Sequence, residues 1–213
     1  MRRCAMPSGL QRRPRVSKGG FVEFRQGVQN ASNIVLFQYN PEKMTRKLVH
    51  PTVETCSDEP EHTRRDLHAL MPPSETISLT LELDSTDQLE HPRTIKKGLL
   101  PTLSALEMMM YPECYHNLDS PRGKSFDERE QSGEWPTVLF ICGASRLIPV
   151  RFNDLTITEE AFDENLNPIR AKIELEMQVL SDVEMERNSV GYNAYVNYIV
   201  NKQFTSINRR DQA

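Results

Sequence analysis

The sequence has no long hydrophobic run, little glycine and few cysteines. No stretch of its 213 residues approaches the roughly 20 consecutive apolar residues that a membrane-spanning helix needs. The 9 glycines and 14 prolines are too few for a collagen-like chain or for one that is disordered throughout. The N-terminus is basic but lacks the apolar segment of a secretory signal, so we expect neither Sec export nor a membrane span.

The cysteines are scattered rather than grouped, which argues against a disulfide framework. Cys4, Cys56, Cys114 and Cys142 show no pairing pattern, and we expect them to be the reduced thiols of a protein assembled in the cytoplasm. Hydrophobic residues make up 38% of the chain and charged residues 26%, enough for one folded core under a polar surface. The length fits one domain with appendages.

Charge is distributed unevenly along the chain. Residues 1–20 hold six of the 26 basic residues and none of the 30 acidic ones. We expect residues 1–20 to be a flexible basic tail, or an arm that lies against an acidic neighbouring subunit. An arm that touches nucleic acid or an anionic membrane is the alternative, but we do not expect nucleic acid as a partner.

Two segments alternate strictly between aliphatic and polar residues, residues 76–83 and residues 172–179. Side chains alternate across a β-strand, so each segment predicts a strand with one buried and one wet face. The apolar run at residues 33–39 predicts a strand buried on both faces, which ends at the turn signal Asn40-Pro41. Residues 44–49 are predicted to be its partner strand.

Three further strands are expected, at residues 21–25, 138–141 and 147–158. The last one changes parity, because its apolar positions are even before Asn153-Asp154 and odd after it. One extra residue there predicts a β-bulge that bends the strand, as strands bend where sheets close into barrels.

Two helices are predicted. Leu99, Leu103, Leu106 and Met110 form one apolar stripe, with Pro101 tolerated in the first turn. The second helix is C-terminal, and five of its residues share one face: Tyr192, Tyr195, Val196, Ile199 and Val200. Together these elements predict a mainly β, α+β fold: an antiparallel barrel or sandwich with one internal helix and one C-terminal helix.

The predicted domain spans residues 21–182, followed by a helical extension at 183–213. Its two polar, proline-containing segments, 50–73 and 112–135, are predicted to be long loops that contact neighbouring subunits. Trp135 is expected to anchor the second loop in the core, with a ligand-stacking role as the alternative. Met108 or Met109 is expected to face a partner.

No constellation of residues indicates catalysis, a cofactor or a metal. There is no glycine-rich phosphate loop and no G-x-S-x-G elbow; Gly143 to Arg146 reads as a tight turn. Metal binding by the cysteines and histidines of the loops would require distant loops to converge, and we favour solvated histidines. The candidates are Cys56, His62, His68, Cys114 and His116 for metal, and Glu159-Glu160 and Asp163-Glu164 for acid–base chemistry, where a solvated turn is the simpler interpretation.

Six stretches, in order over residues 33–181, resemble one known family. They are Val35-Leu36-Phe37-Gln38-Tyr39-Asn40-Pro41-Glu42; Glu75 to Asp84; Gly98-Leu99-Leu100-Pro101; Pro136 to Phe140; Leu147-Ile148-Pro149-Val150-Arg151; and Leu155 to Asp163 continuing through Asn165 to Ala171. This order is similar to that of the tube-type baseplate proteins of extracellular contractile injection systems, which are phage-tail-like particles.

The resemblance implies a β-barrel-like fold similar to phage tail tube and type VI secretion tube proteins. It implies a non-enzymatic subunit that forms a hexameric ring, links the baseplate spike to the inner tube and initiates tube assembly. Its partners would be copies of itself, the spike protein, the tube protein and other baseplate subunits, with no small-molecule substrate. The particle would form in the cytoplasm and then be released or docked at a membrane.

Two features depart from the family pattern. Some relatives continue into a peptidoglycan-binding LysM module, and residues 183–213 are too few for one, so we expect no direct cell-wall binding. The basic arm and the two long loops have no counterpart in that pattern. A soluble β-barrel module that binds a protein or nucleic acid is the alternative function, because fold alone does not decide between them.

Overall fold

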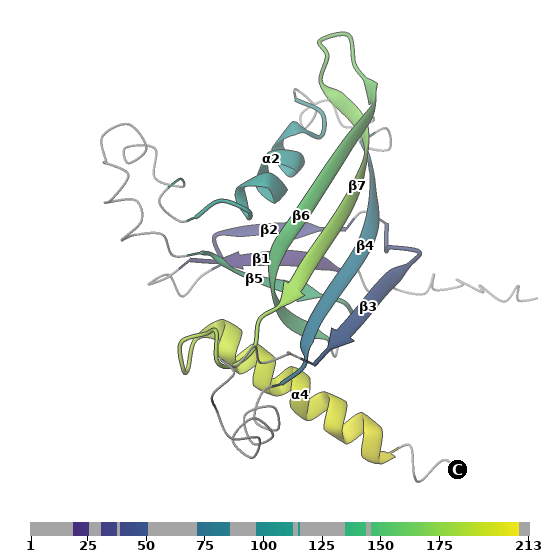
Figure 1. Cartoon of the computed structure of the whole chain (residues 1–213). Coiled ribbons are helices and arrows are strands. Elements are labelled where there is room, and N and C mark those ends of the chain that lie inside the picture. The colour runs from purple at the N-terminus through teal and green to yellow at the C-terminus, as the bar shows by residue number, and fades with distance from the viewer. Residues whose placement is uncertain are drawn as a thin grey trace, which may run out of the picture.

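The computed structural model describes residues 19–25, 31–37, 39–50, 72–85, 97–112, 115, 135–143 and 146–208, which hold seven strands and two helices (Figure 1). The strands are β1 (Gly20–Phe24), β2 (Asn33–Leu36), β3 (Met44–Val49), β4 (Ser74–Asp84), β5 (Thr137–Ile141), β6 (Leu147–Phe162) and β7 (Pro168–Val179), and the helices are α2 (Leu100–Met108) and α4 (Val190–Asn208). The predicted mainly β, α+β class is confirmed, including both helices.

All seven strands belong to one antiparallel sheet in the order β2-β1-β5-β6-β7-β4-β3. Strands β1, β2 and β5 run across the direction of β4, β6 and β7, so the sheet is strongly bent (Figure 1). The pairing starts at β2 and ends at β3 without joining them in the part of the chain that is described. It therefore leaves two sheet edges and does not show the closure of a barrel.

The bend of the sheet lies in β6, the strand shared by both halves. The β6–β7 register steps from Phe152↔Met177 to Asp154↔Glu176, which leaves Asn153 as an extra residue. The bulge predicted from the parity change at Asn153-Asp154 is thus confirmed. It returns the apolar positions after it to the core side of the sheet.

The core lies on the concave side of the bent sheet. On β4 and β7 the odd-numbered aliphatic residues are buried and most even-numbered ones are wet, as the alternation predicts. Phe21 of β1 packs against Phe37, Phe140 and Phe152, with ring centroids 5.0–5.4 Å away. Each fully buried phenylalanine contributes about 1.5–3 kcal/mol, so this cluster fixes the β1–β5–β6 end.

Helix α2 covers the core with Leu103 and Leu106, as its sequence predicts. Two contacts position it. The Leu99 amide donates to the carbonyl of Pro168 at 2.7 Å. Gly98 has φ +56, and a Cβ there would overlap that same carbonyl oxygen, so only glycine fits. Met109 is buried and Met108 half-buried, so Met109 does not face a partner.

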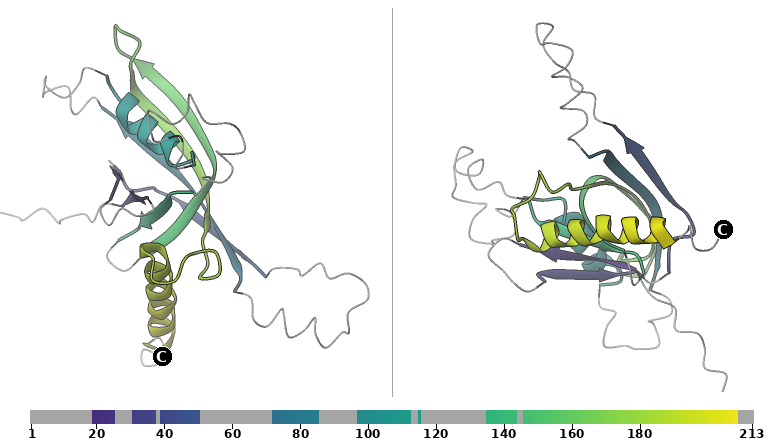
Figure 2. Two further views of the ribbon diagram at one scale, coloured as in Figure 1. Left: turned by 90° about the vertical axis from the view of Figure 1, so that its left-hand side faces the viewer. Right: turned by 90° about the horizontal axis from the view of Figure 1, so that it is seen from below.

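Helix α4 crosses the end of the sheet, where it lies nearest the viewer when the molecule is seen from below (Figure 2). Its buried residues are Gly191, Ala194 and Tyr198. Of the five residues predicted to share one face, Tyr192, Tyr195 and Ile199 are half-buried, whereas Val196 and Val200 are exposed. Small residues allow the closer approach: a Cβ on Gly191 would lie 2.8 Å from Cγ2 of Thr137.

Three other expectations are corrected. Strand β2 is not buried on both faces, because it is an edge strand whose Ile34 and Leu36 are exposed while Val35 is buried. β3 pairs with β4 at the other edge rather than with β2. Trp135 is about half exposed and does not anchor the loop in the core; its neighbour Pro136 is buried.

Several predictions fall outside the described residues. They concern residues 1–18 of the basic arm and most of the loops 50–73 and 112–135. Gly19 and Gly20 are described, and β1 begins at Gly20. The domain limits at residues 20 and 182 remain predictions.

Candidate functional site

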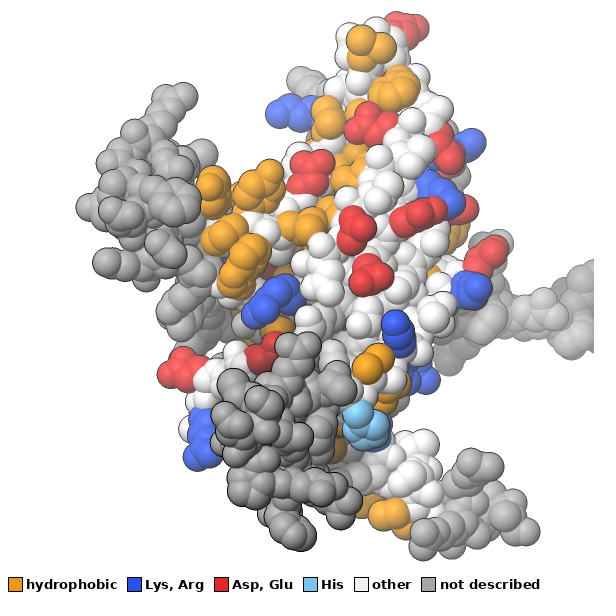
Figure 3. Space-filling view, in the orientation of Figure 1, with side chains coloured by type: hydrophobic (Ala, Val, Ile, Leu, Met, Phe, Trp, Pro, Cys, Tyr) orange, Lys and Arg blue, Asp and Glu red, His pale blue; other side chains and the backbone are white. Residues whose placement is uncertain are grey.

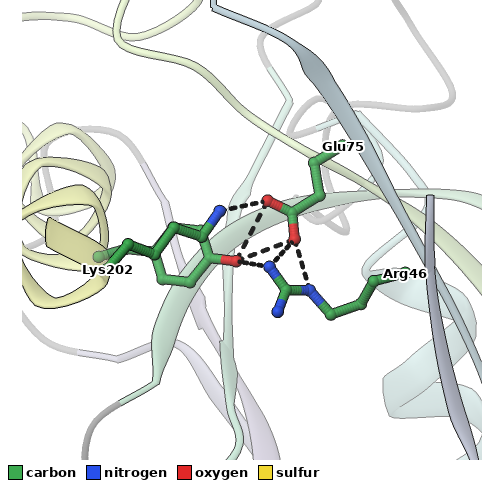
Figure 4. Close-up of polar contacts among 4 residues, drawn as sticks. Arg46, Glu75 and Lys202 are labelled. Atoms are coloured by element: carbon green, nitrogen blue, oxygen red, sulfur yellow. Dashed lines mark hydrogen bonds and ion pairs between the residues drawn. The ribbon is translucent and has the colours of Figure 1, made fainter. Parts of the chain in front are cut away.

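A buried group of charges lies where α4 meets the sheet edge. Arg46 of β3, Glu75 of β4, and Tyr198 and Lys202 of α4 form what we call the Glu75 cluster (Figure 4). Glu75 points to the core side of β4, because it shares the parity of the buried Ile77. It is only 4% exposed. A buried carboxylate needs charged partners, and this one has two.

Every oxygen of the cluster is hydrogen-bonded. Nε of Arg46 donates to Oε1 of Glu75 at 2.7 Å, and Nζ of Lys202 donates to Oε2 at 2.8 Å. The Tyr198 hydroxyl donates to the Glu75 carboxylate at 2.9 Å and accepts from Nη2 of Arg46 at 2.7 Å. Nζ of Lys202 also lies 4.1 Å from the centroid of the Tyr198 ring, a cation–π distance.

These contacts fix the protonation states. Burial alone would raise the pKa of Glu75, but hydrogen bonds from Lys202, Arg46 and Tyr198 outweigh it and hold the pKa below its ordinary value. Burial, the hydrogen bond to Glu75 and the negative charge of Glu75 raise the pKa of the Tyr198 hydroxyl. At neutral pH the cluster is thus an ionised carboxylate, a neutral tyrosine and two cations. It holds neither a free base nor a nucleophile, and its effect is to tie α4 to β3 and β4.

A cavity of about 280 Å³ opens beside the cluster, between α4 and the sheet edge. Its walls are largely apolar and include Leu48, Pro73, Val179, Tyr195 and Ile199. Glu75 and Lys202 line it but already bond each other. Ser181 and Glu184 also line it and bond each other, and Ser74 and Gln178 complete its polar lining. The cavity therefore offers a mainly apolar surface with several polar groups, most of which already have partners within the chain.

The wet face of β3, β4, β6 and β7 forms a second, larger feature. A groove of about 380 Å³ runs over it, with walls of hydroxyl and acidic side chains. Its lining includes Ser78, Thr80, Asp154, Thr156, Glu174 and Glu176. Figure 3 shows acidic side chains spread over this face. Asp154 and Glu176 are directly paired across β6 and β7, an arrangement of like charges that disfavours burial.

The two sheet edges present apolar side chains to solvent. Ile34 and Leu36 are exposed on β2, and Leu48 and Val49 are exposed on β3. An exposed edge offers unpaired backbone groups to another chain, and soluble proteins commonly protect such edges with charges. β3 carries Arg46 and Lys47, whereas β2 carries no charged residue.

The sequence-predicted acid–base candidates are not brought together into a site. Glu159 and Glu160 are exposed near the end of β6, at a second register shift. Asp163 lies in the β6–β7 turn, where Oδ1 accepts from the amides of Asn165 and Asn167 and Oδ2 accepts from Nδ2 of Asn167, each at 2.8 Å. The Asn167 side chain and these amides lower the pKa of Asp163. Its lone pairs are thus used to shape the turn.

The metal candidates cannot be assembled either. Cys56, His62, His68, Cys114 and His116 all lie outside the described residues. Among those that are described, no three His, Cys, Asp or Glu side chains are placed to hold a metal ion, and no helix is long and apolar enough to cross a membrane. Cys142 is a half-buried free thiol.

Sequence reasoning missed the Glu75 cluster. Its members lie on three elements and are up to 156 positions apart in the chain, from Arg46 to Lys202. One signal was present: Glu75 occupies a core-side position in the alternation of β4. A scan against protein-family models and a search of curated proteins each find no match for this chain.

Proposed function

We propose that this chain is a structural, non-enzymatic subunit of a phage-tail-like contractile injection system. In this role it forms a hexameric ring between the baseplate spike and the inner tube, and it initiates tube assembly. The spike, tube and other baseplate subunits would be its partners. Assembly would take place in the cytoplasm, before release or docking of the particle.

The observation that carries the proposal is the open, bent sheet with one wet face, whose outermost strands β2 and β3 each have no further strand partner among the described residues. A ring requires two different patches that meet on successive copies. Edge β2, which is apolar and uncharged, and edge β3, which is basic, are two such patches on one chain. Joining them would continue the sheet from copy to copy and close it around an axis as a barrel of many strands.

The wet face supports the same proposal. Its hydroxyl and carboxylate groups would suit the wall of a water-filled tube, and Lys172 and Glu174 pair on it at 2.9 Å. Within the described residues, both carboxylate oxygens of Glu75 and the Tyr198 hydroxyl are already hydrogen-bonded inside the chain. This fits a subunit that works through its outer surfaces.

The sequence motifs give independent support, because they coincide with structural devices. Gly98-Leu99-Leu100-Pro101 starts α2 at a position that only glycine allows. Residues 155–171 form the hairpin of β6 and β7.

The test is imaging of the full chain by negative-stain electron microscopy, alone and co-expressed with spike and tube subunits of such a particle. We expect sixfold rings or short stacked tubes of constant diameter. The variant Ile34→Lys places a charge on edge β2 and is expected to abolish the rings. Glu176→Lys, on the wet face of β7 and paired on both sides by β4 and β6, is the matched control and should form them.

Monomers under all these conditions would contradict the proposal. A monomer that instead captures a defined protein or DNA partner with 1:1 stoichiometry would favour the alternative, a soluble binding module. The apolar cavity beside Glu75 is the feature that such a module would use.

A further inference from the structure

The β6–β7 hairpin ends in a hydrophobic tip that the fold itself does not require. Leu166 is 80% exposed and has φ +60, a backbone conformation that costs free energy for any residue with a branched side chain. Phe162, at the base of the turn, is also about half exposed. The three hydrogen bonds to Asp163 hold this turn in place. A strained and exposed leucine on a braced hairpin indicates a contact made with another molecule.

A second unpartnered surface lies on α4. Val196, Val200, Phe204 and Ile207 follow one another at spacings of four, four and three, so they share one side of the helix. Their exposed fractions are 39%, 37%, 62% and 58%. We call this side the α4 stripe. It lies opposite the side that packs on the sheet, the side of Ala194 and Tyr198.

The two surfaces face away from each other. The hairpin is at the upper end of the molecule in Figure 1, and α4 is at the lower end. In the view from below, α4 lies in front of the sheet, so the side away from the sheet points out of that end (Figure 2). One copy can therefore present its hairpin tip to the α4 stripe of another copy in the same orientation.

The hairpin tip and α4 differ in charge. Residues 152–169, which form the hairpin tip and its flanks, hold five acidic residues and no basic one. Helix α4 contains no acidic residue and is followed in the sequence by Arg209 and Arg210; its one lysine, Lys202, bonds Glu75 on the side that packs on the sheet. An acidic tip with an apolar knob thus fits an apolar stripe on a helix free of acidic groups.

We propose that the hairpin tip of one copy docks on the α4 stripe of the next, so that copies of this chain join head to tail. The inference rests on the proposed function for its setting, because such contacts would stack one ring on another. The contact is heterologous and does not close on itself. A knob and one helix side form a small interface, so each contact is weak alone, and several contacts between two rings would add avidity.

A membrane surface and a second α4 helix fit the α4 stripe less well than the hairpin tip does. A helix that lies on a membrane carries many lysines or arginines on its polar side, whereas α4 has a single lysine, already bonded to Glu75. Pairing of two α4 stripes would leave the strained Leu166 without a partner. Both alternatives give distinct results in the experiment below.

The direct test is disulfide trapping between full-length copies that carry different tags. One copy carries Leu166→Cys and the other Ile207→Cys, and they are mixed and mildly oxidised. We expect a mixed-tag dimer from this pair, and a ladder of multimers from the variant that carries both substitutions. Glu82→Cys, exposed on the wet face of β4, replaces either partner as the matched control for the native cysteines and should give no mixed dimer.

A same-tag dimer formed only through Ile207→Cys would overturn the proposal in favour of paired helices. No cross-link above the Glu82→Cys control would overturn it as well. So would cross-linking that appears only when anionic vesicles are added, because it would assign the stripe to a membrane.

Variants at the tip separate association from folding. Leu166→Asn suits a positive φ better than leucine does, so we expect unchanged or slightly higher thermal stability together with at least tenfold weaker association by sedimentation velocity. Equal loss of stability and association would assign Leu166 to folding and overturn the proposal. Glu164→Lys and Asn197→Glu should each weaken association, and the two together should restore it; additive weakening would count against the charge pairing.

The two proposals can fail separately. Rings that form but neither stack nor cross-link through residues 166 and 207 would leave the proposed function standing and refute this contact. Head-to-tail ladders without any sixfold ring would support this contact and refute the proposed function.

Discussion

Glu75 and Asp163 are carboxylates that each accept three or more hydrogen bonds, and they lie at opposite ends of the β-sheet. Glu75 is buried between α4 and the sheet and has two cationic partners. Asp163 is bonded only by amides, in the exposed β6–β7 turn. In both, hydrogen bonds hold the pKa below its ordinary value. The two sites differ in what a substitution leaves behind. Loss of Glu75 leaves the charges of Arg46 and Lys202 unpaired beside the core, whereas water can replace Asp163 as the acceptor for the exposed amides.

The largest effect is expected from Glu75→Ala, which leaves Arg46 and Lys202 without their anion. Removing one partner of a fully buried ion pair costs about 3–5 kcal/mol. The side chains of Arg46 and Lys202 are 30% and 36% exposed, so water screens part of the loss and we expect about 2–3 kcal/mol. Urea unfolding of the full chain measures it. Glu82→Ala, on the wet face of the same strand, is the control and should change stability by less than about 0.5 kcal/mol.

Acid should reproduce part of this loss without mutation. Since the pKa of Glu75 is lowered in the folded protein, its stabilisation is complete above its ordinary value of 4.5 and disappears as the pH falls through the lower folded value. We expect the unfolding midpoint to fall more steeply below about pH 4.5 in the wild-type protein than in Glu75→Ala. Parallel pH profiles for the two proteins would show that Glu75 does not titrate in this way.

A smaller effect is expected from Tyr198→Phe. The substitution keeps the ring in the core but removes the hydroxyl that donates to Glu75 and accepts from Arg46. Losing a hydrogen bond to a charged group costs about 1.5 kcal/mol. Hydrogen exchange should show faster opening of α4 than of β7. Uniform acceleration over the whole sheet would mean that α4 does not open as a separate unit.

The smallest of these losses is expected from Asp163→Ala at the other end of the sheet. The amides of Asn165 and Asn167 lose their acceptor but remain accessible to water. We expect faster exchange of these two amides and little change in global stability. A global loss as large as that of Glu75→Ala would remove the distinction drawn between the two carboxylates.

The sequence predicted most strands because their signals are local. The alternation in β4 and β7 and the parity change at Asn153 each follow from side-chain geometry within one strand, and both appear in the structure. Strand pairing was harder, because β3 follows β2 in the chain but pairs with β4. The side of α4 that packs on the sheet was not predicted, because its buried residues include Gly191 and Ala194, which no hydrophobic pattern singles out.

The candidate surfaces were less predictable than the fold. The Glu75 cluster depends on contacts among three distant segments, which no spacing rule reports. Ile34 and Leu36 were predicted to be buried but are exposed. An apolar run predicts a buried strand whether that strand lies at the edge of a sheet or at its centre. Exposure at an edge is set by the neighbours of a strand, not by its own residues.

The bulged strand β6 also has a mechanical consequence. Its sixteen residues run without interruption from the half of the sheet beneath α4 to the hairpin tip, roughly 50 Å at the usual rise of a strand. Tension applied at Leu166 along the strands would load β6 and β7 together, so it would shear the hydrogen bonds of β6 to β5 and of β7 to β4 rather than those within the hairpin. The bend at Asn153 would straighten first, so this single extra residue would be the most easily extended point of the strand.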